Sequence, residues 1–232
     1  MPLRKWIESL NNAVEGVLQA AKTERHLRYH LYAAAVVILF GYAVGVTKTE
    51  FLIIALTTLF VIMAELINTA IEATVDLLSP QKSEQARIAK DVAAGAVLTT
   101  ALGAAVIGYI VLFPYLVGLF KHGLSVAKHA KNEIAVLALI IVTIMVVLIK
   151  ALIGKGRPIR GGMPSGHAAI SFSIWVSITF ISKNFTASLL SFIAAVLIAQ
   201  SRVTVKIHNL MEVVAGALLG AAVTLVLFVI FV

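Results

Sequence analysis

The sequence predicts an all-α integral membrane protein in which an amphipathic surface helix precedes about seven transmembrane helices. Of the 232 residues, 60% are hydrophobic and only 13% are charged, and the mean hydropathy is +1.00. The interior of a soluble domain is too small, relative to its surface, to bury so many apolar side chains. The apolar residues also gather in separate segments whose lengths approach that of a membrane span.

The first predicted element is an amphipathic helix over residues 3–24. Its apolar residues recur at helical spacing with charged and polar residues between them: Leu3, Trp6, Ile7, Leu10, Val14, Val17 and Leu18. Such a helix can lie in the membrane interface with its apolar face toward the lipid. The alternative is an ordinary surface helix, which this composition disfavours.

Seven apolar segments follow, and each predicts a transmembrane helix. They are residues 31–46, 51–64, 92–120, 134–149, 168–182, 185–200 and 213–232. Several are shorter than the roughly 20 residues that span the hydrocarbon core, so we expect each helix to continue into its polar flanks. The polar, basic stretch 121–131 predicts a linker between a domain of residues 1–120, with three spans, and a domain of residues 132–232, with four.

Charge and cysteine content narrow the possible functions. The formal net charge is +8, and no cysteine is present, which excludes disulfides and thiolate chemistry. Nucleic-acid binding is one interpretation of a basic chain. In a membrane protein, cationic loops against anionic headgroups explain the same charge, so we expect no nucleic-acid partner. Residues 1–30 contain no apolar core of a cleavable signal peptide.

The second apolar segment runs into an acidic helix face. Glu65, Asn68, Glu72 and Asp76 are separated by three, four and four residues, which places them on one side of a helix. Each ionised group would cost about 2.5–3.5 kcal/mol at the bilayer centre, so three acids in one stripe need a counter-charge. Mg²⁺ with nucleotide phosphates suits carboxylates, and a spare carboxylate can act as a general base. The alternative is a stripe solvated at headgroup level or paired across helices.

These residues carry a resemblance to a known family. The stretches AELINTAIEATVDL (64–77), IAKDVAAGAVL (88–98) and KTERHLRYH (22–30) resemble the prokaryotic diacylglycerol and undecaprenol kinases over about residues 4–114. The resemblance implies that Glu65 is the general base and that Glu24 and Glu72 hold Mg²⁺. It also implies residues that bind or orient ATP and the lipid: Asn68, Asp76, Lys90 and Asp91. Members of the family are homotrimers with active sites between subunits at the cytoplasmic surface.

Three basic and histidine-containing clusters follow in the second half. They are Lys150-x6-Arg157-Pro158, Pro164-Ser165-Gly166-His167 and Ser201-Arg202-x5-His208-x3-Glu212. Lys and Arg side chains can clamp the oxygens of a phosphoryl group, and two histidines can serve as nucleophile and general acid. Single members have plainer explanations, since basic residues can be membrane anchors and a lone His is more often structural. The joint pattern favours phosphoryl chemistry.

Together the clusters resemble the type 2 phosphatidic acid phosphatase (PAP2) superfamily over about residues 132–232. The resemblance implies that His208 attacks phosphorus, that Glu212 supports it, that His167 protonates the leaving oxygen and that no metal is needed. It also implies the phosphate-binding residues: Lys150, Arg157, Ser165, Gly166 and Arg202. Two features depart from the family pattern: Glu212 stands where an Asp is usual, and this half has four spans where six are typical.

These resemblances predict a bifunctional lipid kinase and phosphatase, multi-pass in the bacterial cytoplasmic membrane. Because ATP is cytoplasmic, counting spans from Glu65 places both active sites on the cytoplasmic side. The larger share of Lys and Arg falls in the segments predicted to be inside, as expected for that orientation.

We expect the two activities to share undecaprenyl phosphate as product, made from undecaprenol by the kinase and from undecaprenyl diphosphate by the phosphatase. One alternative is a diacylglycerol kinase fused to a phosphatidic acid or phosphatidylglycerol phosphate phosphatase. A transporter would predict broken helices and inverted repeats, which the sequence lacks. A scaffold with one inactive half would predict gaps among the site residues, and none is missing.

Overall fold

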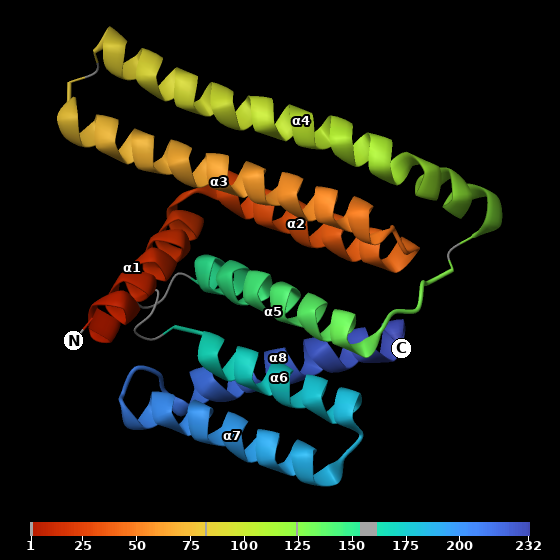
Figure 1. Cartoon of the computed structure of the whole chain (residues 1–232). Coiled ribbons are helices and arrows are strands. Elements are labelled where there is room, and N and C mark those ends of the chain that lie inside the picture. Colours follow the sequence, from red (N-terminus) through yellow and green to blue (C-terminus); the bar gives the residue numbers. More distant parts are fainter. Residues whose placement is uncertain (1, 82, 124, 154–161) are drawn as a thin grey trace. The chain divides into compact units, whose positions relative to one another are not determined.

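The computed structural model of the chain describes residues 2–81, 83–123, 125–153 and 162–232. Within these residues every regular secondary-structure element is a helix, as Figure 1 shows. The helices are α1 (Pro2–Thr23), α2 (Arg25–Val44), α3 (Lys48–Leu78), α4 (Glu84–His122), α5 (Lys131–Ile153), α6 (Gly166–Ser182), α7 (Phe185–Thr204) and α8 (Leu210–Phe231).

Six of the described helices are long and apolar enough to cross a membrane, namely α2, α3, α4, α5, α7 and α8. Helix α6 is apolar but shorter, with 17 residues. It corresponds to the predicted segment 168–182, so each of the seven predicted segments corresponds to a helix. The prediction of an all-α integral membrane protein is therefore confirmed.

Side-chain caps fix where several helices begin. Thr47 and Glu50 form a reciprocal capping box at the start of α3, in which the Glu50 carboxylate accepts from the Thr47 backbone N–H at 2.8 Å. Asn209 and Glu212 form the same arrangement at the start of α8. Each box satisfies backbone N–H groups that have no partner within the helix. Ser83 and Asn184 cap α4 and α7 in the simpler way.

The chain folds into two compact units. One contains residues Glu24–Ala127, and the other combines Met1–Thr23 with Lys128–Val232. The first helix therefore packs with the C-terminal helices, although it precedes the first predicted span in sequence. Hydrophobic periodicity predicts which face of such a helix is buried, but it does not predict which helix covers that face.

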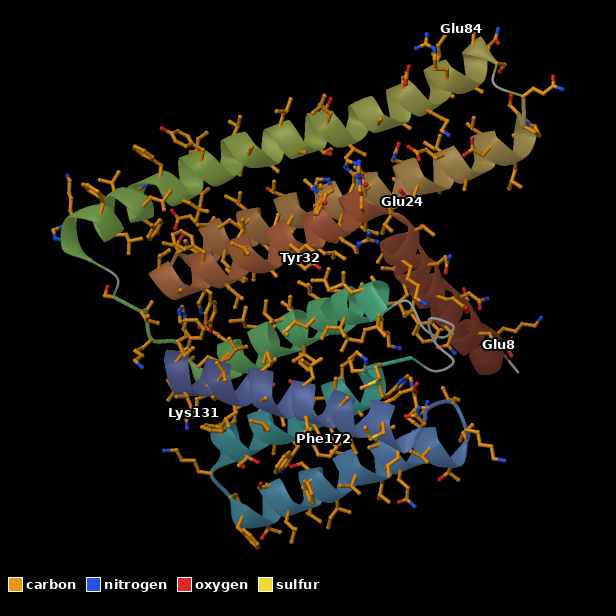
Figure 2. All side chains as sticks on the ribbon, turned by 180° about the vertical axis from the view of Figure 1, so that it is seen from behind. Glu8, Glu24, Tyr32, Glu84, Lys131 and Phe172 are labelled. Carbon is orange, nitrogen blue, oxygen red and sulfur yellow. The ribbon has the colours of Figure 1, made fainter. Side chains whose placement is uncertain are left out.

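In the unit of residues Glu24–Ala127, α2, α3 and α4 lie side by side (Figure 1). With 31 and 39 residues, α3 and α4 are about 46 and 58 Å long at 1.5 Å per residue, longer than the roughly 30 Å hydrocarbon core. The charged residues gather where α3 ends and α4 begins; Figure 2 marks Glu84 at that end. At the opposite end, the Tyr115 hydroxyl donates to the Glu50 carboxylate at 2.7 Å and ties α4 to α3.

Many apolar side chains of α4 have no cover within this unit. Leu98, Leu102 and Ile110 are each 60–65% exposed. A soluble protein rarely leaves such a long apolar stripe open, because contact with water would be unfavourable along its whole length. Lipid or another protein chain must cover this face.

In the other unit, α6 and α8 approach most closely. A Cβ on Gly216 would overlap the backbone oxygen of Ser165, and a Cβ on Gly220 would overlap that of Ala169. One turn further along, the buried hydroxyls of Ser173 and Thr224 are 2.7 Å apart. Phe172 of α6, labelled in Figure 2, packs edge-on against Trp175 and against Phe192 of α7.

Helix α1 completes this unit by packing against α5. Its C-terminal half is the anchored part, since Leu18, Ala20 and Ala21 are all buried. Toward its N-terminus, Leu10 and Val14 remain about half exposed. The helix is therefore fixed at the end nearest Glu24 and is less covered toward Pro2.

Candidate functional site

The acidic residues predicted to share a helix face all lie within the unbroken helix α3. Glu65 is buried, with only 4% of its surface exposed. Glu24, Glu72, His26 and His30 lie close enough to Glu65 to interact with it electrostatically. Residues from the start of α2 and the middle of α3 thus form one charged cluster. Figure 2 marks Glu24 just before α2.

Asn68 and Glu72 contact each other within this cluster. The Asn68 side-chain amide donates to the Glu72 carboxylate at 3.0 Å. The amide oxygen of Asn68 is buried and has no hydrogen-bond partner among the described residues. A buried acceptor without a partner is unfavourable, so this oxygen suits a hydrogen-bond donor or a hydrated cation.

The cluster fits a magnesium ion that is shared with a nucleotide. Among the residues that the structure describes, no group of three or more His, Cys, Asp or Glu side chains could hold a metal by itself. Mg²⁺ usually takes only one or two protein carboxylates and completes its shell with phosphate oxygens and water. Glu24 and Glu72, which both act on Glu65, supply two carboxylates of the required kind.

The other predicted residues of the first half lie further along the α3–α4 hairpin. The Lys90 ammonium donates to both oxygens of the Asp76 carboxylate, at 2.9 and 3.1 Å. Asp91 accepts from Arg87 at 2.8 Å on the exposed face of α4. These pairs are solvent-exposed, so each contributes little to stability and can open for a ligand at low cost.

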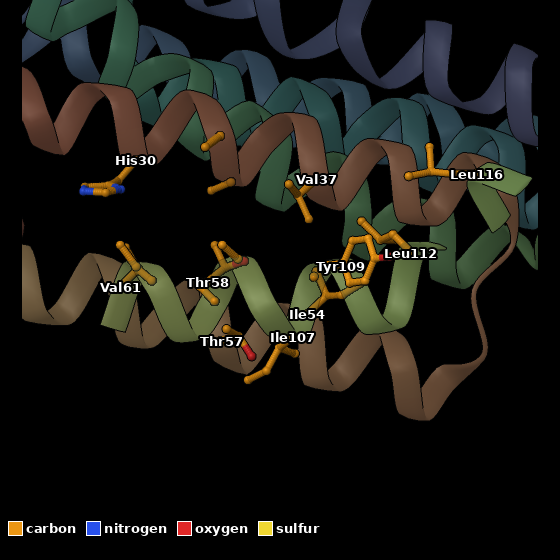
Figure 3. A pocket seen from close by; sticks show the side chains of 16 residues that line it. His30, Val37, Ile54, Thr57, Thr58, Val61, Ile107, Tyr109, Leu112 and Leu116 are labelled. Carbon is orange, nitrogen blue, oxygen red and sulfur yellow. The ribbon is translucent and has the colours of Figure 1, made fainter. Parts of the chain in front are cut away.

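An apolar pocket of about 440 Å³ lies between α2, α3 and α4 (Figure 3). His30 lies at one end and Leu116 at the other, with Val37 and Thr58 between them. His30 is also one of the groups that act on Glu65. The pocket therefore runs from the neighbourhood of the buried carboxylate into the apolar part of the unit.

In the second half, His208 and Glu212 form the centre of the site. The Nδ1 atom of His208 lies 2.8 Å from the Glu212 carboxylate. The His208 side chain is only 2% exposed, and that of Glu212 only 14%. Glu212 also accepts from the backbone N–H of Gly162 at 3.0 Å and of Asn209 at 3.2 Å. The carboxylate is thus held by the loop before α6 and by its own helix start.

This arrangement sets the protonation of the imidazole. A carboxylate can only accept a hydrogen bond, so Nδ1 of His208 carries the proton and Nε2 presents its lone pair. Burial lowers the pKa of His208 below its ordinary value, and the charges of Lys150 and Arg202 act in the same direction. The hydrogen bond that His208 donates to Glu212 opposes this effect but does not outweigh it. His208 is therefore a neutral imidazole near pH 7, as a nucleophile must be.

Ser165 stands at the start of α6 as its N-cap residue. Its hydroxyl is fully buried and has no hydrogen-bond partner in the described part of the chain. The Ser165 backbone N–H donates to the Glu212 carbonyl at 2.8 Å, which joins this turn to the start of α8. The free N–H groups of a helix N-terminus attract anions, so an oxyanion placed here would also satisfy the hydroxyl.

The remaining basic residues converge on the same place. Lys150, Arg202 and His208 all lie close enough to His167 to interact with it electrostatically. Lys150, Gly166, His167 and His208 line one pocket of about 300 Å³. Arg202 also donates to the Ser201 hydroxyl at 3.1 Å. Arg157, the remaining predicted phosphate ligand, lies outside the described residues.

Some residues of this site were not predicted from the sequence. Asn209 and Gly162 hold Glu212, and four residues of α1 line the pocket: Leu10, Asn11, Val14 and Leu18. The Asn-x2-Glu spacing of a capping box could have revealed Asn209. No pattern in the sequence indicates that α1 reaches the second-half site.

Comparison with known proteins finds two families along the chain. Residues 11–112 match the family described as prokaryotic diacylglycerol kinase. Residues 133–232 match the PAP2 superfamily. No solved structure matches the chain.

Several relatives resemble the first half. The undecaprenol kinase of Bacillus subtilis (strain 168) is 38% identical over 114 residues, which cover 49% of this chain and 93% of the relative. A diacylglycerol kinase of Synechocystis is 39% identical over 127 residues, covering 51% of this chain and 73% of the relative. A diacylglycerol kinase of Haemophilus influenzae is 30% identical over 89 residues, which cover 38% of this chain and 75% of the relative.

Proposed function

The chain belongs to the prokaryotic diacylglycerol kinase family and carries a second region, residues 133–232, that matches the PAP2 superfamily; from this premise we propose a bifunctional enzyme whose two reactions converge on undecaprenyl phosphate. The kinase phosphorylates undecaprenol with ATP. The phosphatase removes the terminal phosphoryl group of undecaprenyl diphosphate. The observation that carries the proposal is that each half holds a buried titratable side chain among charged neighbours, Glu65 in the first half and His208 in the second.

In the kinase reaction, the Glu65 carboxylate accepts the proton of the lipid hydroxyl. The lipid oxygen then bonds to the γ-phosphorus of ATP while the bond to the β-phosphate oxygen breaks and ADP leaves. Glu24 and Glu72 would hold Mg²⁺, which when bound neutralises charge on the phosphates. We assign nucleotide or substrate contacts to Asn68, Asp76, Lys90 and Asp91.

The position of Glu65 supports its assignment as general base, because its carboxylate is buried beside the pocket that begins at His30. The apolar pocket that begins at His30 would take the hydrocarbon chain of the lipid alcohol. The exposed apolar face of α4 is consistent with further chains packed against it, as in a homotrimer.

In the phosphatase reaction, Nε2 of His208 bonds to the terminal phosphorus. The bond to the bridging oxygen breaks, and His167 donates a proton to that oxygen so that undecaprenyl phosphate leaves. Water then cleaves the phosphohistidine and releases inorganic phosphate. Glu212 holds the imidazole and stabilises its positive charge, while Lys150, Arg157, Ser165, Gly166 and Arg202 bind the phosphoryl oxygens.

We place both sites on the cytoplasmic side of a bacterial inner membrane. Two opposed reactions on one lipid in one leaflet would only consume ATP, whereas two routes to one product avoid that cycle. A diacylglycerol kinase joined to a phosphatidic acid or phosphatidylglycerol phosphate phosphatase remains the second candidate, supported by the Synechocystis relative.

The test is an assay of the purified protein with each lipid alcohol, monophosphate and diphosphate, with and without Mg-ATP. We expect labelled phosphate to pass from ATP to undecaprenol, and undecaprenyl diphosphate to yield undecaprenyl phosphate and inorganic phosphate. Free undecaprenol as the main phosphatase product would contradict the proposal. A strong preference for diacylglycerol and phosphatidic acid would establish the second candidate.

A further inference from the structure

Helix α1 forms one wall of the His208 pocket. The pocket of about 300 Å³ has three kinds of lining. His208, His167 and Lys150 are its basic and imidazole residues. Helices α5 and α6 contribute apolar side chains: Val146, Val147 and Ile170. Helix α1 contributes Leu10, Val14 and Leu18, with Asn11 as the polar residue that it adds to the lining.

The burial of α1 shows how this wall is held. Leu18 and Ala21 are 6% and 0% exposed and fix the C-terminal half of the helix against its unit. Leu10 and Val14 are 52% and 47% exposed, yet both line the pocket. Their surfaces therefore remain open for an apolar ligand instead of being covered by protein.

The chemistry of the pocket matches an amphipathic anion. The cationic and imidazole groups suit a phosphoryl group, and the apolar residues suit a hydrocarbon chain attached to it. The volume of about 300 Å³ lies within the roughly 300–1,000 Å³ typical of ligand pockets. The occupant that fits both kinds of lining is the phosphorylated lipid itself.

We propose that α1 binds the hydrocarbon chain of the phosphatase substrate beside its phosphoryl group, and that Leu10 and Val14 select for that chain. This inference rests on the proposed phosphatase function. Residues 11–23 lie within the stretch that matches the kinase family, so in this chain one helix would belong to the kinase by sequence and serve the phosphatase by position.

A chain-length series tests the proposal. The substrates are isopentenyl, farnesyl and undecaprenyl diphosphate, which share a headgroup and differ in the apolar chain. Val14→Trp fills the pocket wall and should lower kcat/KM for the two longer substrates about tenfold, the usual scale for apolar pocket discrimination. The value for isopentenyl diphosphate should change little.

Val17→Trp is the matched control, because Val17 is a partly exposed valine of the same helix that does not line the pocket. It should leave all three values unchanged. An equal loss for every substrate with Val14→Trp, no loss for any, or the same selective loss with Val17→Trp would overturn the proposal.

Photolabelling separates this inference from the proposed function. A prenyl diphosphate with a diazirine near its headgroup should label the α1 peptide around Val14, and undecaprenyl diphosphate should compete. If the wild-type protein is labelled on α1 but does not hydrolyse the diphosphate, α1 binds the chain and the phosphatase reaction is refuted. Hydrolysis without competed labelling of α1 would overturn the role of the helix and leave the phosphatase standing.

Discussion

His208 and Glu212 form a pair in which Nδ1 of the imidazole lies 2.8 Å from a carboxylate that also completes the capping box of α8. One side chain therefore orients the imidazole of His208 and begins the helix that follows it. The extra methylene of Glu, relative to the usual Asp, is compatible with both contacts.

The first prediction separates the charge of Glu212 from its capping role. Gln also serves in a capping box, so Glu212→Gln should retain the start of α8. It removes the charge that stabilises the imidazolium and should lower phosphatase kcat by about 10² or more. Kinetics and thermal unfolding in detergent check this. A rate within twofold of wild type would contradict it, and an intact kinase rate is the internal control.

The second prediction concerns pH. Because burial lowers the pKa of His208, the neutral nucleophile persists below the ordinary pKa of about 6.5. Phosphatase kcat/KM should therefore fall only as pH drops below that value. The same shift costs stability in acid, since the unfolded imidazole binds a proton more readily than the folded one.

Glu212→Gln provides the control for this pH profile. It removes the negative charge of Glu212, which raises the pKa of His208, so the acid limb should move to still lower pH. An acid limb centred above pH 6.5 in the wild type, or an opposite shift in the variant, would refute the electrostatic account.

The third prediction uses the buried hydroxyl of Ser165. Because that hydroxyl has no partner among the described residues, Ser165→Ala should leave the unfolding temperature unchanged or slightly higher. Loss of a hydrogen bond to an anion, worth about 1.5–3 kcal/mol, should lower phosphatase kcat/KM by roughly 10–150-fold. A destabilised protein with normal kinetics would show that the hydroxyl is structural.

The fourth prediction tests the close contact of α6 and α8. Gly220→Ala would place a methyl group against the Ala169 backbone oxygen and should destabilise its unit by about 1–3 kcal/mol, as overpacking does. Gly16→Ala is the control, because Gly16 has open space around its Cα and lies in a helix of the same unit. It should raise stability slightly. Equal unfolding temperatures for both variants would contradict the packing described.

The fifth prediction concerns sidedness, and the absence of cysteine makes it direct. Gln85→Cys, at the start of α4, and Thr204→Cys, at the end of α7, should react with an impermeant maleimide from the same side of the membrane. Ser125→Cys should react from the other side. All three residues are exposed in the structure. Reaction of Gln85→Cys and Thr204→Cys from opposite sides would place the two sites on different faces.

The parts of both sites that follow from helical spacing could be predicted from the sequence. Glu65 to Asp76 share one face of α3, and His208 precedes Glu212 by one turn, because 3.6 residues per turn convert spacing directly into position. The seven apolar segments predicted as transmembrane helices likewise correspond to helices α2 to α8.

The parts that depend on packing between distant helices could not be predicted. The Asp76–Lys90 pair requires the geometry of the α3–α4 hairpin. The docking of α1 beside Lys150 depends on which apolar surface its amphipathic face meets, and periodicity carries no such information. The burial of Ser165 follows from the close approach of Gly216, which no local pattern indicates.

The most direct test of two independent sites is one assay that follows both reactions in two variants. Phosphate transfer from ATP to undecaprenol and phosphate release from undecaprenyl diphosphate are measured in Glu65→Ala and in His208→Ala. Loss of a general base typically costs about 10²–10⁴ in rate, so Glu65→Ala should lose transfer and keep release, while His208→Ala should do the reverse. Loss of both activities in either folded variant would contradict the account.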